Sequence, residues 1–365
     1  MSRIEVIHCF GKMNAGGAET LIYNVYKAID KNRFHFSFLV FNSDSGFYDE
    51  DIEQLGGDIF YLPCISDKGV WRYLNNLIAF FKEHKPDVVH SHMDWQGGFI
   101  AYAANKANVK KIIVHAHADQ RIFKKNLFYK CLINLNKILI KKYATHRLAC
   151  SRIAGESLFY EDFKILNNGI DYCKFQHADL SKISELKEEF NIKPSDIVIG
   201  SVGGLSKNKN HDFLIDVFHD LYKFNSNYKL IIVGDGVERG TLEKKVNDLK
   251  LFNAVCFAGV RKDIPEFMNV FDVFVLPSLS EGLGIVAIEA QACGLPCVLS
   301  ECVPSEVDFK QSPVCFLPLI KSLWVKALLN HDFIVSKKKI DPDDLPVRFS
   351  ISNTETELED LYKFY

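Results

Sequence analysis

The sequence predicts an α/β protein with two Rossmann-like domains, each a doubly wound parallel sheet, that face each other across a cleft. Three observations carry this prediction. The chain has 365 residues, more than one hydrophobic core usually organises. Short apolar runs alternate with longer helical patterns, which is typical of βαβ units. This alternation stops at the polar stretch 171–196 and then begins again.

The first half contains six predicted strands separated by helical segments. The strands are expected at 3–10, 34–41, 59–62, 87–91, 111–116 and 145–150. The helices are expected at 18–30, 70–84, 97–107 and 122–143. Ser151 is predicted to cap a further short helix, because a serine there accepts a hydrogen bond from a free backbone N–H.

The second half repeats the pattern until it fades. Strands are expected at 196–202, 228–233, 254–258, 272–276 and 296–300, and helices at 210–223, 238–250, 263–269 and 283–293. Residues 303–350 give no clear pattern, and TETELEDLYKFY predicts a closing helix. We therefore expect a first domain at 1–175, a second at 176–340, and a segment 341–365 whose helix packs back on the first domain.

The composition is that of an ordinary globular protein. Hydrophobic residues make up 48% of the chain and charged residues 25%. Residues 1–170 contain 22 Lys/Arg and 17 Asp/Glu, a net charge of +5, whereas the rest of the chain carries −7. The basic first half is therefore expected to meet an anionic partner.

The N-terminus and the cysteines indicate the compartment. MSRIEVIHCF reads as a first strand and not as a signal peptide, and no apolar run reaches the roughly 18 residues of a membrane span. The ten cysteines include no CxxC pair and no zinc-type spacing. We therefore expect a cytoplasmic protein with reduced, mostly buried thiols.

Residues that carry chemistry follow the predicted strands, where ligands bind to open parallel sheets. GKMNAGGAET opens the first helix, and Gly16 and Gly17 let an anion approach free backbone N–H groups, although a plain glycine turn fits as well. Four histidines follow two later strands: His90, His92, His115 and His117. One or two of them are candidates for hydrogen bonds to a ligand. Asp119 is the one nearby carboxylate with suggestive spacing, so no metal site is expected.

Two segments of the second half also follow predicted strands. VIGSVGGLSKNKNHDFL puts Lys209 at a helix start, which suits a diphosphate, although solvated surface lysines give the same pattern. LPSLSEGLGIVAIEAQACGLP places Glu281 in a Gly-flanked loop and Glu289 in the following helix. Two carboxylates at the mouth of a sheet suit recognition of hydroxyls and stabilisation of positive charge, but two surface glutamates are equally compatible.

Together these segments resemble the large retaining glycosyltransferase family 4, which has the GT-B architecture, and especially its bacterial capsular and exopolysaccharide branch. The resemblance covers residues 5–310. The matching segments occur in the family's order: GGAE, VVHSH, HAHAD, ACS, NNGID, VGGLSKNKNH, VGDG, FAGVRKDIPEFM, DVFVLPSLSEGLGIVAIEA and GLPCVLS. The most specific of them is the pair of glutamates with seven residues between them, after a Pro-Ser strand end.

The resemblance implies transfer of a hexose or N-acetylhexosamine, with retention, from a nucleotide-diphosphate sugar. The donor is expected to be UDP-linked, and the acceptor a growing glycan or a lipid-linked one in surface polysaccharide biosynthesis. The first domain would then be the acceptor side and the second would bind the nucleotide sugar. No cofactor, metal or nucleic acid is expected, because positioning and electrostatic stabilisation suffice for this chemistry.

The resemblance also assigns roles to single residues. His117 and Glu281 are expected to be catalytic, next to the transferred sugar. The expected donor-binding residues are Gly16, Gly17, Gly204, Lys209, Arg261, Gly282, Leu283 and Glu289. Among these, Lys209 would pair with the phosphates, Glu289 would accept from the ribose hydroxyls, and the base would lie near 254–258 and Arg261.

One position departs from the family pattern. Gly204 stands where the family commonly has an arginine, five residues before the lysine, that neutralises the leaving phosphate. Loss of that cation is expected to weaken the leaving-group interaction by on the order of 2–4 kcal/mol, with Lys207 as a partial substitute. The departure keeps open a non-catalytic sugar-nucleotide-binding partner subunit. A second alternative is a sugar-nucleotide epimerase of the same architecture, whereas a nicotinamide dehydrogenase is disfavoured because G-x-G-x-x-G is absent.

The segment 120–147 is basic and amphipathic. It contains eight Lys/Arg and no acid: Arg121, Lys124, Lys125, Lys130, Lys137, Lys141, Lys142 and Arg147. Apolar residues recur between them at roughly helical spacing. One interpretation is a helix whose apolar stripe packs on the sheet and whose lysines are solvated. The other is a surface that binds anionic lipid, which would make the protein peripheral on the inner face of the plasma membrane.

Overall fold

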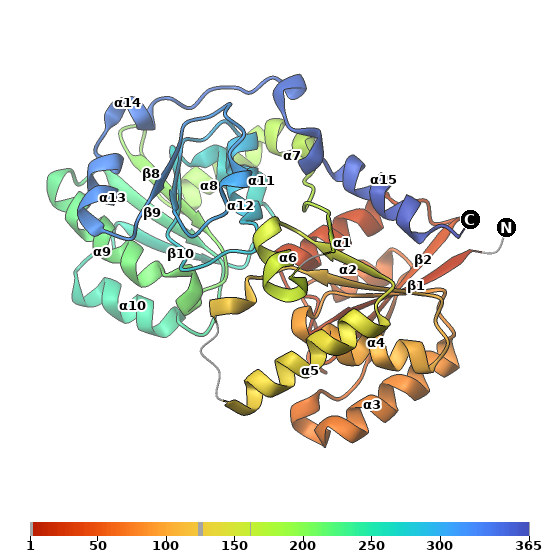
Figure 1. Cartoon of the computed structure of the whole chain (residues 1–365). Coiled ribbons are helices and arrows are strands. Elements are labelled where there is room, and N and C mark those ends of the chain that lie inside the picture. The colour runs from red at the N-terminus through yellow and green to blue at the C-terminus, as the bar shows by residue number, and fades with distance from the viewer. Residues whose placement is uncertain (1–2, 123–126, 161, 365) are drawn as a thin grey trace. The chain divides into compact units, whose positions relative to one another are not determined.

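The computed structural model describes residues 3–122, 127–160 and 162–364, which form two compact units (Figure 1). Unit 1 consists of Met1–Gly169 with Ile351–Tyr365, and unit 2 of Ile170–Ser350. The first boundary therefore falls before Ile170, where the sequence suggested 175, and the second falls after Ser350, where it suggested 340.

Unit 1 contains a seven-stranded parallel sheet in the order β3-β2-β1-β4-β5-β6-β7. Its strands are β1 (Ile4–Phe10), β2 (Phe34–Val40), β3 (Asp58–Tyr61), β4 (Val88–Ser91), β5 (Lys111–Ala116), β6 (His146–Ala149) and β7 (Lys164–Ile165). Its helices are α1 (Gly17–Ala28), α2 (Asp49–Gln54), α3 (Ile65–His84), α4 (Gly97–Lys106), α5 (Leu127–Tyr143), α6 (Arg152–Phe159) and α15 (Ile351–Tyr362).

Unit 2 contains a six-stranded parallel sheet in the order β10-β9-β8-β11-β12-β13. Its strands are β8 (Ile197–Val202), β9 (Tyr228–Val233), β10 (Val255–Gly259), β11 (Val273–Leu276), β12 (Cys297–Ser300) and β13 (Val314–Leu317). Its helices are α7 (Tyr172–Gln176), α8 (Leu180–Glu189), α9 (His211–Phe224), α10 (Arg239–Asp248), α11 (Ile264–Val270), α12 (Ile285–Ala292), α13 (Lys321–Leu328) and α14 (His331–Ile334).

The strand order of each sheet places its ligand-binding crevice. In unit 1, β1 pairs with β2 on one side and β4 on the other, so the strand order reverses there. In unit 2, β8 lies in the same way between β9 and β11. Open parallel sheets bind ligands at such a switch point, beyond the carboxyl ends of the strands. The loops after β1 and β4, and those after β8 and β11, are therefore the places to look for a site.

Burial, amphipathic spacing and helix capping explain why these segments form strands and helices. The strands are nearly continuous apolar runs because helices cover both faces of the sheet, and β2 has six of its seven residues buried. In α9, the buried residues Leu214, Val217, Phe218 and Leu221 recur at helical spacing and face the core. The predicted cap of α6 is confirmed, since the Ser151 side chain accepts from the Ala154 backbone N–H at 3.1 Å.

The last helix of the chain belongs to unit 1 (Figure 1). Leu358 and Tyr362 of α15 are fully buried in the core that α1 and β2 also form. The Tyr362 hydroxyl makes a hydrogen bond of 2.7 Å to Nδ1 of His90, although 272 residues separate the two in the sequence. The Thr354 hydroxyl donates to the carbonyl of Asn167 at 3.2 Å. These contacts tie the end of the chain to β4 and to the segment that follows β7.

The cysteines only partly follow the sequence-based expectation. All ten are free, but the expectation that most are buried is wrong, because only Cys9, Cys150 and Cys297 are buried. The other seven side chains are partly or fully exposed, and two of them, Cys256 and Cys315, lie in the edge strands β10 and β13. In the part of the chain that the structure describes, no helix combines the length and the apolar character needed to cross a bilayer.

Candidate active site

In unit 2, the loops after β8 and β11 are joined by hydrogen bonds. Asn208 donates from Nδ2 to the Ser280 carbonyl at 2.8 Å, and its own carbonyl accepts from the Leu279 backbone N–H at 2.8 Å. Asn210 donates from Nδ2 to the Pro277 carbonyl at 3.2 Å. The sequence analysis did not single out these asparagines, although their repetition in KNKN was visible. They hold the two loops at the switch point together.

This arrangement brings two of the predicted site residues into contact. Nζ of Lys209 lies 2.6 Å from Oε1 of Glu281, and the Ser278 hydroxyl donates to the same oxygen at 2.5 Å. Both side chains are mostly buried, at 22% and 10% exposure, so solvent screens their attraction less than that of a surface ion pair. The stem of Lys209 runs along Gly203, where an added Cβ would lie 3.2 Å from Cε of the lysine.

Glu289 lies on α12, the helix that follows the loop of Glu281, and is only 9% exposed. Burial raises the pKa of its carboxyl group from 4.5 to about 8. The helix starts from Gly284, whose φ of +86° is a left-handed conformation that glycine adopts without strain. Leu283 has a buried side chain, so it can offer a ligand only its backbone. Gly282 lies in the same loop, directly after Glu281.

Two other donor-side predictions have different surroundings. Gly204 is exposed, and a Cβ added there would meet only the Asp235 carbonyl oxygen, at 3.7 Å. Arg261 is held by two carboxylates: it donates to Asp263 at 2.7 and 2.9 Å and to Glu189 at 2.9 and 3.3 Å. These ion pairs raise the pKa of the guanidinium group. Arg261 therefore acts as a structural link between α8 and the loop after β10 in the ligand-free unit.

In unit 1, the predicted glycines lie at the start of α1, as Gly16 caps the helix and Gly17 begins it. The carboxyl group of Glu19 bends back to this helix end, so close that a Cβ on Gly16 would lie 2.3 Å from Oε2. Burial raises the pKa of Glu19 from 4.5 to about 7, against a hydrogen bond from its own backbone N–H and with a smaller contribution from Asp94. Glu19 thus occupies the end of the helix at which an anion is expected.

His117 follows β5 and is held by its side chain and its backbone. Its Nε2 lies 2.9 Å from Nδ1 of His92, and its backbone N–H donates to Oδ1 of Asp94 at 2.8 Å. Burial lowers the pKa of His117 from 6.5 to about 3, so the ring is neutral. Asp94 has a left-handed φ of 47°, a conformation that aspartate tolerates better than most residues. The sequence analysis missed Asp94, whose place just after a strand was the available signal.

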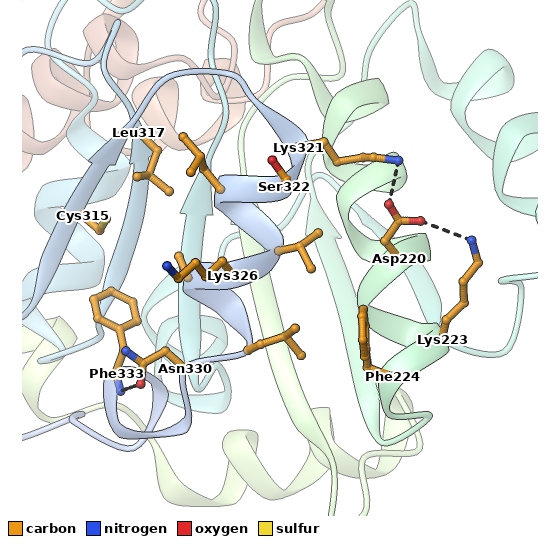
Figure 2. A pocket seen from close by; sticks show the side chains of 14 residues that line it. Asp220, Lys223, Phe224, Cys315, Leu317, Lys321, Ser322, Lys326, Asn330 and Phe333 are labelled. Atoms are coloured by element: carbon orange, nitrogen blue, oxygen red, sulfur yellow. Dashed lines mark hydrogen bonds and ion pairs between the residues drawn. The ribbon is translucent and has the colours of Figure 1, made fainter.

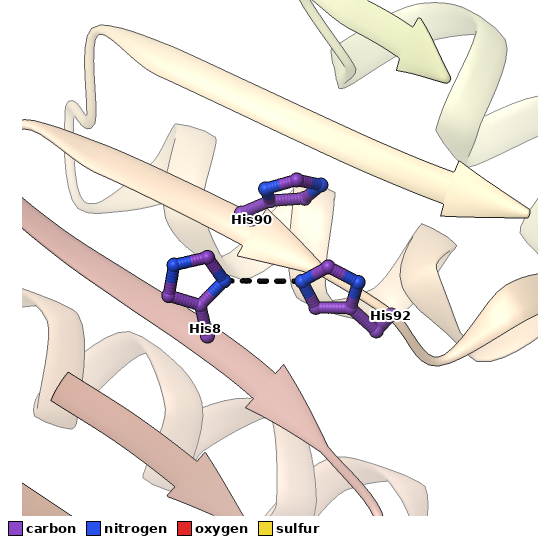
Figure 3. A group of neighbouring side chains, drawn as sticks. All are labelled: His8, His90 and His92. Carbon is purple, nitrogen blue, oxygen red and sulfur yellow. Dashed lines mark hydrogen bonds between the residues drawn. The ribbon is translucent and has the colours of Figure 1, made fainter. Parts of the chain in front are cut away.

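The histidines of unit 1 form a cluster larger than the sequence suggested. His8 of β1 joins His90, His92, His115 and His117. Two sets of three have nitrogens within 4.8 Å of one another: His8, His90 and His92, and His92, His115 and His117. Figure 3 shows the first set, which comes from the neighbouring strands β1 and β4 and the residue after β4.

A groove of about 1010 Å³ in unit 2 lies away from these residues. It is formed by the end of α9, by β13 and by α13 and α14, and on its rim Lys321 and Lys223 both reach Asp220 (Figure 2). The two distances are 2.6 and 3.2 Å. None of the predicted site residues lines it, so the groove is not part of the candidate site.

The chain is similar to known glycosyltransferases over most of its length. Residues 15–172 match the family model described as Glycosyltransferase Family 4, and residues 182–309 match the one described as Glycosyl transferases group 1. The putative glycosyltransferase EpsF of Bacillus subtilis (strain 168) is 36% identical over 341 residues, which cover 90% of this chain and 87% of EpsF.

Two further relatives and one solved structure are similar over most of the chain. The capsular polysaccharide biosynthesis glycosyltransferase CapH of Staphylococcus aureus is 28% identical over 98% of both chains. The UDP-Gal:alpha-D-GlcNAc-diphosphoundecaprenol alpha-1,3-galactosyltransferase of Escherichia coli is 28% identical over 82% of this chain and 80% of its own. The crystal structure of Anabaena HepE with UDP and glucose superposes with a TM-score of 0.80 at 18% identity, covering 98% of this chain and 99% of HepE, which establishes the likeness of fold.

Proposed function

The chain belongs to glycosyltransferase family 4, and we propose that it transfers a hexose or N-acetylhexosamine, with retention, from a UDP-linked donor to a growing glycan or lipid-linked acceptor. It is a glycosyltransferase of polysaccharide and capsule biosynthesis with the GT-B fold. Two relatives support the finer statement. HepE was crystallised with UDP and glucose, and the Escherichia coli enzyme is named for a UDP-sugar and a diphosphoundecaprenol-linked acceptor.

The observation that carries the proposal is the contact between Lys209 and Glu281 at the switch point of unit 2, with Glu289 on the helix that follows the same loop. A cation suits the diphosphate of the donor, and a carboxylate suits a sugar on which positive charge develops. A second carboxylate can accept hydrogen bonds from the ribose hydroxyls. Glu281 supplies to Lys209 the kind of negative charge that a diphosphate would also bring. Binding of the donor is therefore an exchange of one anionic partner of the lysine for another.

The proposed chemistry rests on positioning and electrostatics. Lys209 stabilises the departing diphosphate, and Glu281 stabilises the oxocarbenium-like sugar. The backbone groups of Gly282 and Leu283 are proposed to contact the sugar or the phosphate. In unit 1, Gly16 and Gly17 are proposed to meet the diphosphate, which requires Glu19 to leave the start of α1. His117 keeps its proposed role beside the transferred sugar.

A nucleotide-sugar panel tests the function. We expect UDP-sugars to raise the melting temperature, because a ligand at a hundred times its Kd stabilises by about 2.7 kcal/mol. With a lipid-linked or glycan acceptor, NMR of the product should show the anomeric configuration of the donor, with EDTA leaving the rate unchanged. If UDP-sugars bind but are neither transferred nor hydrolysed, the non-catalytic binding subunit would be favoured. If UDP-sugars are interconverted in the absence of acceptor, the epimerase would be favoured.

We expect Gly204→Arg to tighten binding of UDP about tenfold, because a guanidinium group adds a bidentate phosphate donor near Lys209. The structure has space for the new side chain, since a Cβ at Gly204 meets only one atom, at an ordinary contact distance of 3.7 Å. Calorimetry with UDP measures the effect. Gly204→Gln is the matched control, with similar length and no charge. Equal affinities of the two variants would show that the position does not reach the phosphates.

The exposed face of α5 supports a membrane-facing role for unit 1, although fewer cations are free than the sequence suggested. Lys137 donates to the Ser157 carbonyl at 2.7 Å, Arg147 pairs with Asp162 at 2.5 Å, and Arg121 pairs with Asp119 at 2.9 Å. Phe123, Lys124 and Lys125 lie outside the described residues. Exposed on α5 are three lysines, Lys130, Lys141 and Lys142, and three apolar side chains, Tyr129, Leu135 and Ile138.

We therefore expect the protein to sediment with vesicles that contain anionic lipid and to dissociate as salt rises. Replacing Lys130, Lys141 and Lys142 with glutamine should weaken this binding about 100-fold, because each cation contributes about 1 kcal/mol. Lys137 is left intact because it holds α5 to the end of α6. The matched control replaces three exposed lysines of unit 2: Lys182, Lys187 and Lys244. Equal losses in both triple variants, or no binding at low salt, would contradict the membrane role.

A further inference from the structure

The imidazole cluster of unit 1 contains a continuous hydrogen-bonded chain of three rings. Nδ1 of His8 lies 3.1 Å from Nε2 of His92 (Figure 3), and Nδ1 of His92 lies 2.9 Å from Nε2 of His117. His92 therefore uses both of its ring nitrogens. At the two ends of the chain, Nε2 of His8 and Nδ1 of His117 are buried and have no hydrogen-bond partner among the described residues.

The rings of this chain are neutral. Burial lowers the pKa of His8 and of His117 to about 3, and it holds the pKa of His92 well below the ordinary value. The walls are apolar: the ring of Phe36 lies 4.4 Å from the ring of His8, and Phe10 stacks on His92 at 4.3 Å. A divalent cation here would bring two charges into these surroundings, and neither three-histidine set includes a carboxylate to balance them.

A neutral imidazole carries a single N–H, so the chain can point in only two directions. If His8 donates from Nδ1, His92 accepts at Nε2 and must carry its own proton on Nδ1. His92 then donates to Nε2 of His117, which leaves the proton of His117 on Nδ1. In the reverse direction all three protons move to Nε2. The tautomers of the three histidines are therefore linked, and fixing one of them fixes the others.

The buried end of the chain decides between the two directions. His8 is fully buried, and its Nε2 lies at the end that has no partner. The reverse direction would leave an N–H there, beside the rings of Phe36 and Phe38. The forward direction leaves only a lone pair on His8 and places the unpartnered N–H at the other end, on Nδ1 of His117. His8 is fully buried, whereas the side chain of His117 is half-buried. Because an N–H without an acceptor costs most where burial is complete, the forward direction is favoured.

We propose that His8 and His92 are positioning residues that hold His117 in the Nδ1–H tautomer, so that His117 acts as a hydrogen-bond donor and not as a base. The role of His117 beside the transferred sugar rests on the proposed function, whereas the tautomer does not. A ligand oxygen is the partner that this N–H lacks in the protein. His117 would then bind a sugar hydroxyl or ring oxygen by donation, with its orientation set two rings away.

The tautomers are measured by NMR of the full chain with ¹⁵N-labelled histidine, without ligand. The spectrum of His117→Gln identifies the signals of His117 among those of the twelve histidines. We expect Nδ1 of His117 to carry the proton. In His92→Phe, Nε2 of His117 loses its donor, so we expect loss of the single-tautomer signature. In His92→Gln, the amide can accept from His8 and donate to His117, so the signature should return.

Two controls separate this proposal from a purely structural effect and from the proposed function. His115→Phe removes a buried imidazole that is not part of the hydrogen-bonded chain of His8, His92 and His117, and it should leave the His117 tautomer unchanged. Cobalt(II) added to the protein should produce no histidine-ligated absorption band. An Nε2–H tautomer of His117, equal effects of His92→Phe and His115→Phe, or a cobalt band lost in His92→Phe would each overturn the proposal. None of these readouts uses a nucleotide sugar, so they stand if the proposed function fails.

Discussion

Replacing Glu289 with glutamine is expected to weaken binding of the nucleotide sugar by roughly 10–100-fold, because hydrogen bonds to a charged group contribute about 1.5–3 kcal/mol. The same change should make the ligand-free protein more stable above pH 7. Glu289 is buried and forms no ion pair with any of the described residues, and burial raises its pKa to about 8. A buried glutamate without an ion pair lowers the stability of the fold, so we expect its role to be in binding the ligand.

The pH dependence gives the sign of the stability effect. Because the folded-state pKa is above the unfolded value of 4.5, the protonated carboxyl group stabilises the fold fully below about pH 4.5. This contribution is lost as the pH rises toward 8, where the folded protein must hold a buried charge. Glutamine does not ionise, so the variant should gain on the order of 4 kcal/mol relative to the wild type between pH 5 and pH 8.5.

Thermal unfolding at both pH values and calorimetry with the donor measure the two effects together. Glu266→Gln is a matched control, since Glu266 is also a buried glutamate of unit 2, at 8% exposure, but lies at the start of α11. We expect this control to leave donor affinity unchanged. If Glu289→Gln bound donor as well as the wild type, the ribose assignment would be lost, even if the gain in stability at high pH were found.

The sequence predicted the alternation of strands and helices well because the parallel strands are apolar runs and the helices are amphipathic. Its failures have physical causes. β7 has two residues and α2 has six, too few for a periodic pattern to show. Residues 303–350 gave no pattern because they form one short strand, two short helices and several single turns. The burial of Tyr362 beside His90 depends on a contact between distant segments, which local patterns do not encode.

For the site, the sequence indicated positions and the structure supplied the interactions. Lys209 and Glu281 were assigned separate roles, and their ion pair follows from the hydrogen bonds of Asn208 and Asn210 that join the two loops. Glu19 was visible in GGAE, but its return to the start of its own helix depends on side-chain geometry. Arg261 was predicted from the resemblance as a donor contact. Its two carboxylate partners, one of them 72 residues away, could not be identified from the motif.

Replacing Lys209 with methionine is expected to lower kcat/KM by about 10²–10³-fold, the effect of removing one group that stabilises the developing charge of a transition state. Methionine keeps much of the length and apolar contact of the lysine stem along Gly203, so the loss can be assigned to the charge.

Loss of the Lys209 charge should also affect Glu281 and the stability of the protein. Without the lysine, Glu281 keeps the hydrogen bond from Ser278 but loses its cation, so Lys209→Met should be less stable than the wild type. The double variant Lys209→Met/Glu281→Gln should recover stability, because neither charge remains buried, but it should not recover activity. Lys207→Met, two residues earlier in the same turn and exposed, is the matched comparison: as a partial substitute for the missing arginine it should lower kcat/KM, but by less than Lys209→Met. Steady-state kinetics and thermal unfolding of the four proteins decide the point. A double variant with restored activity would mean that Lys209 only neutralises Glu281, and equal losses for Lys207→Met and Lys209→Met would mean that the loop acts through its total charge.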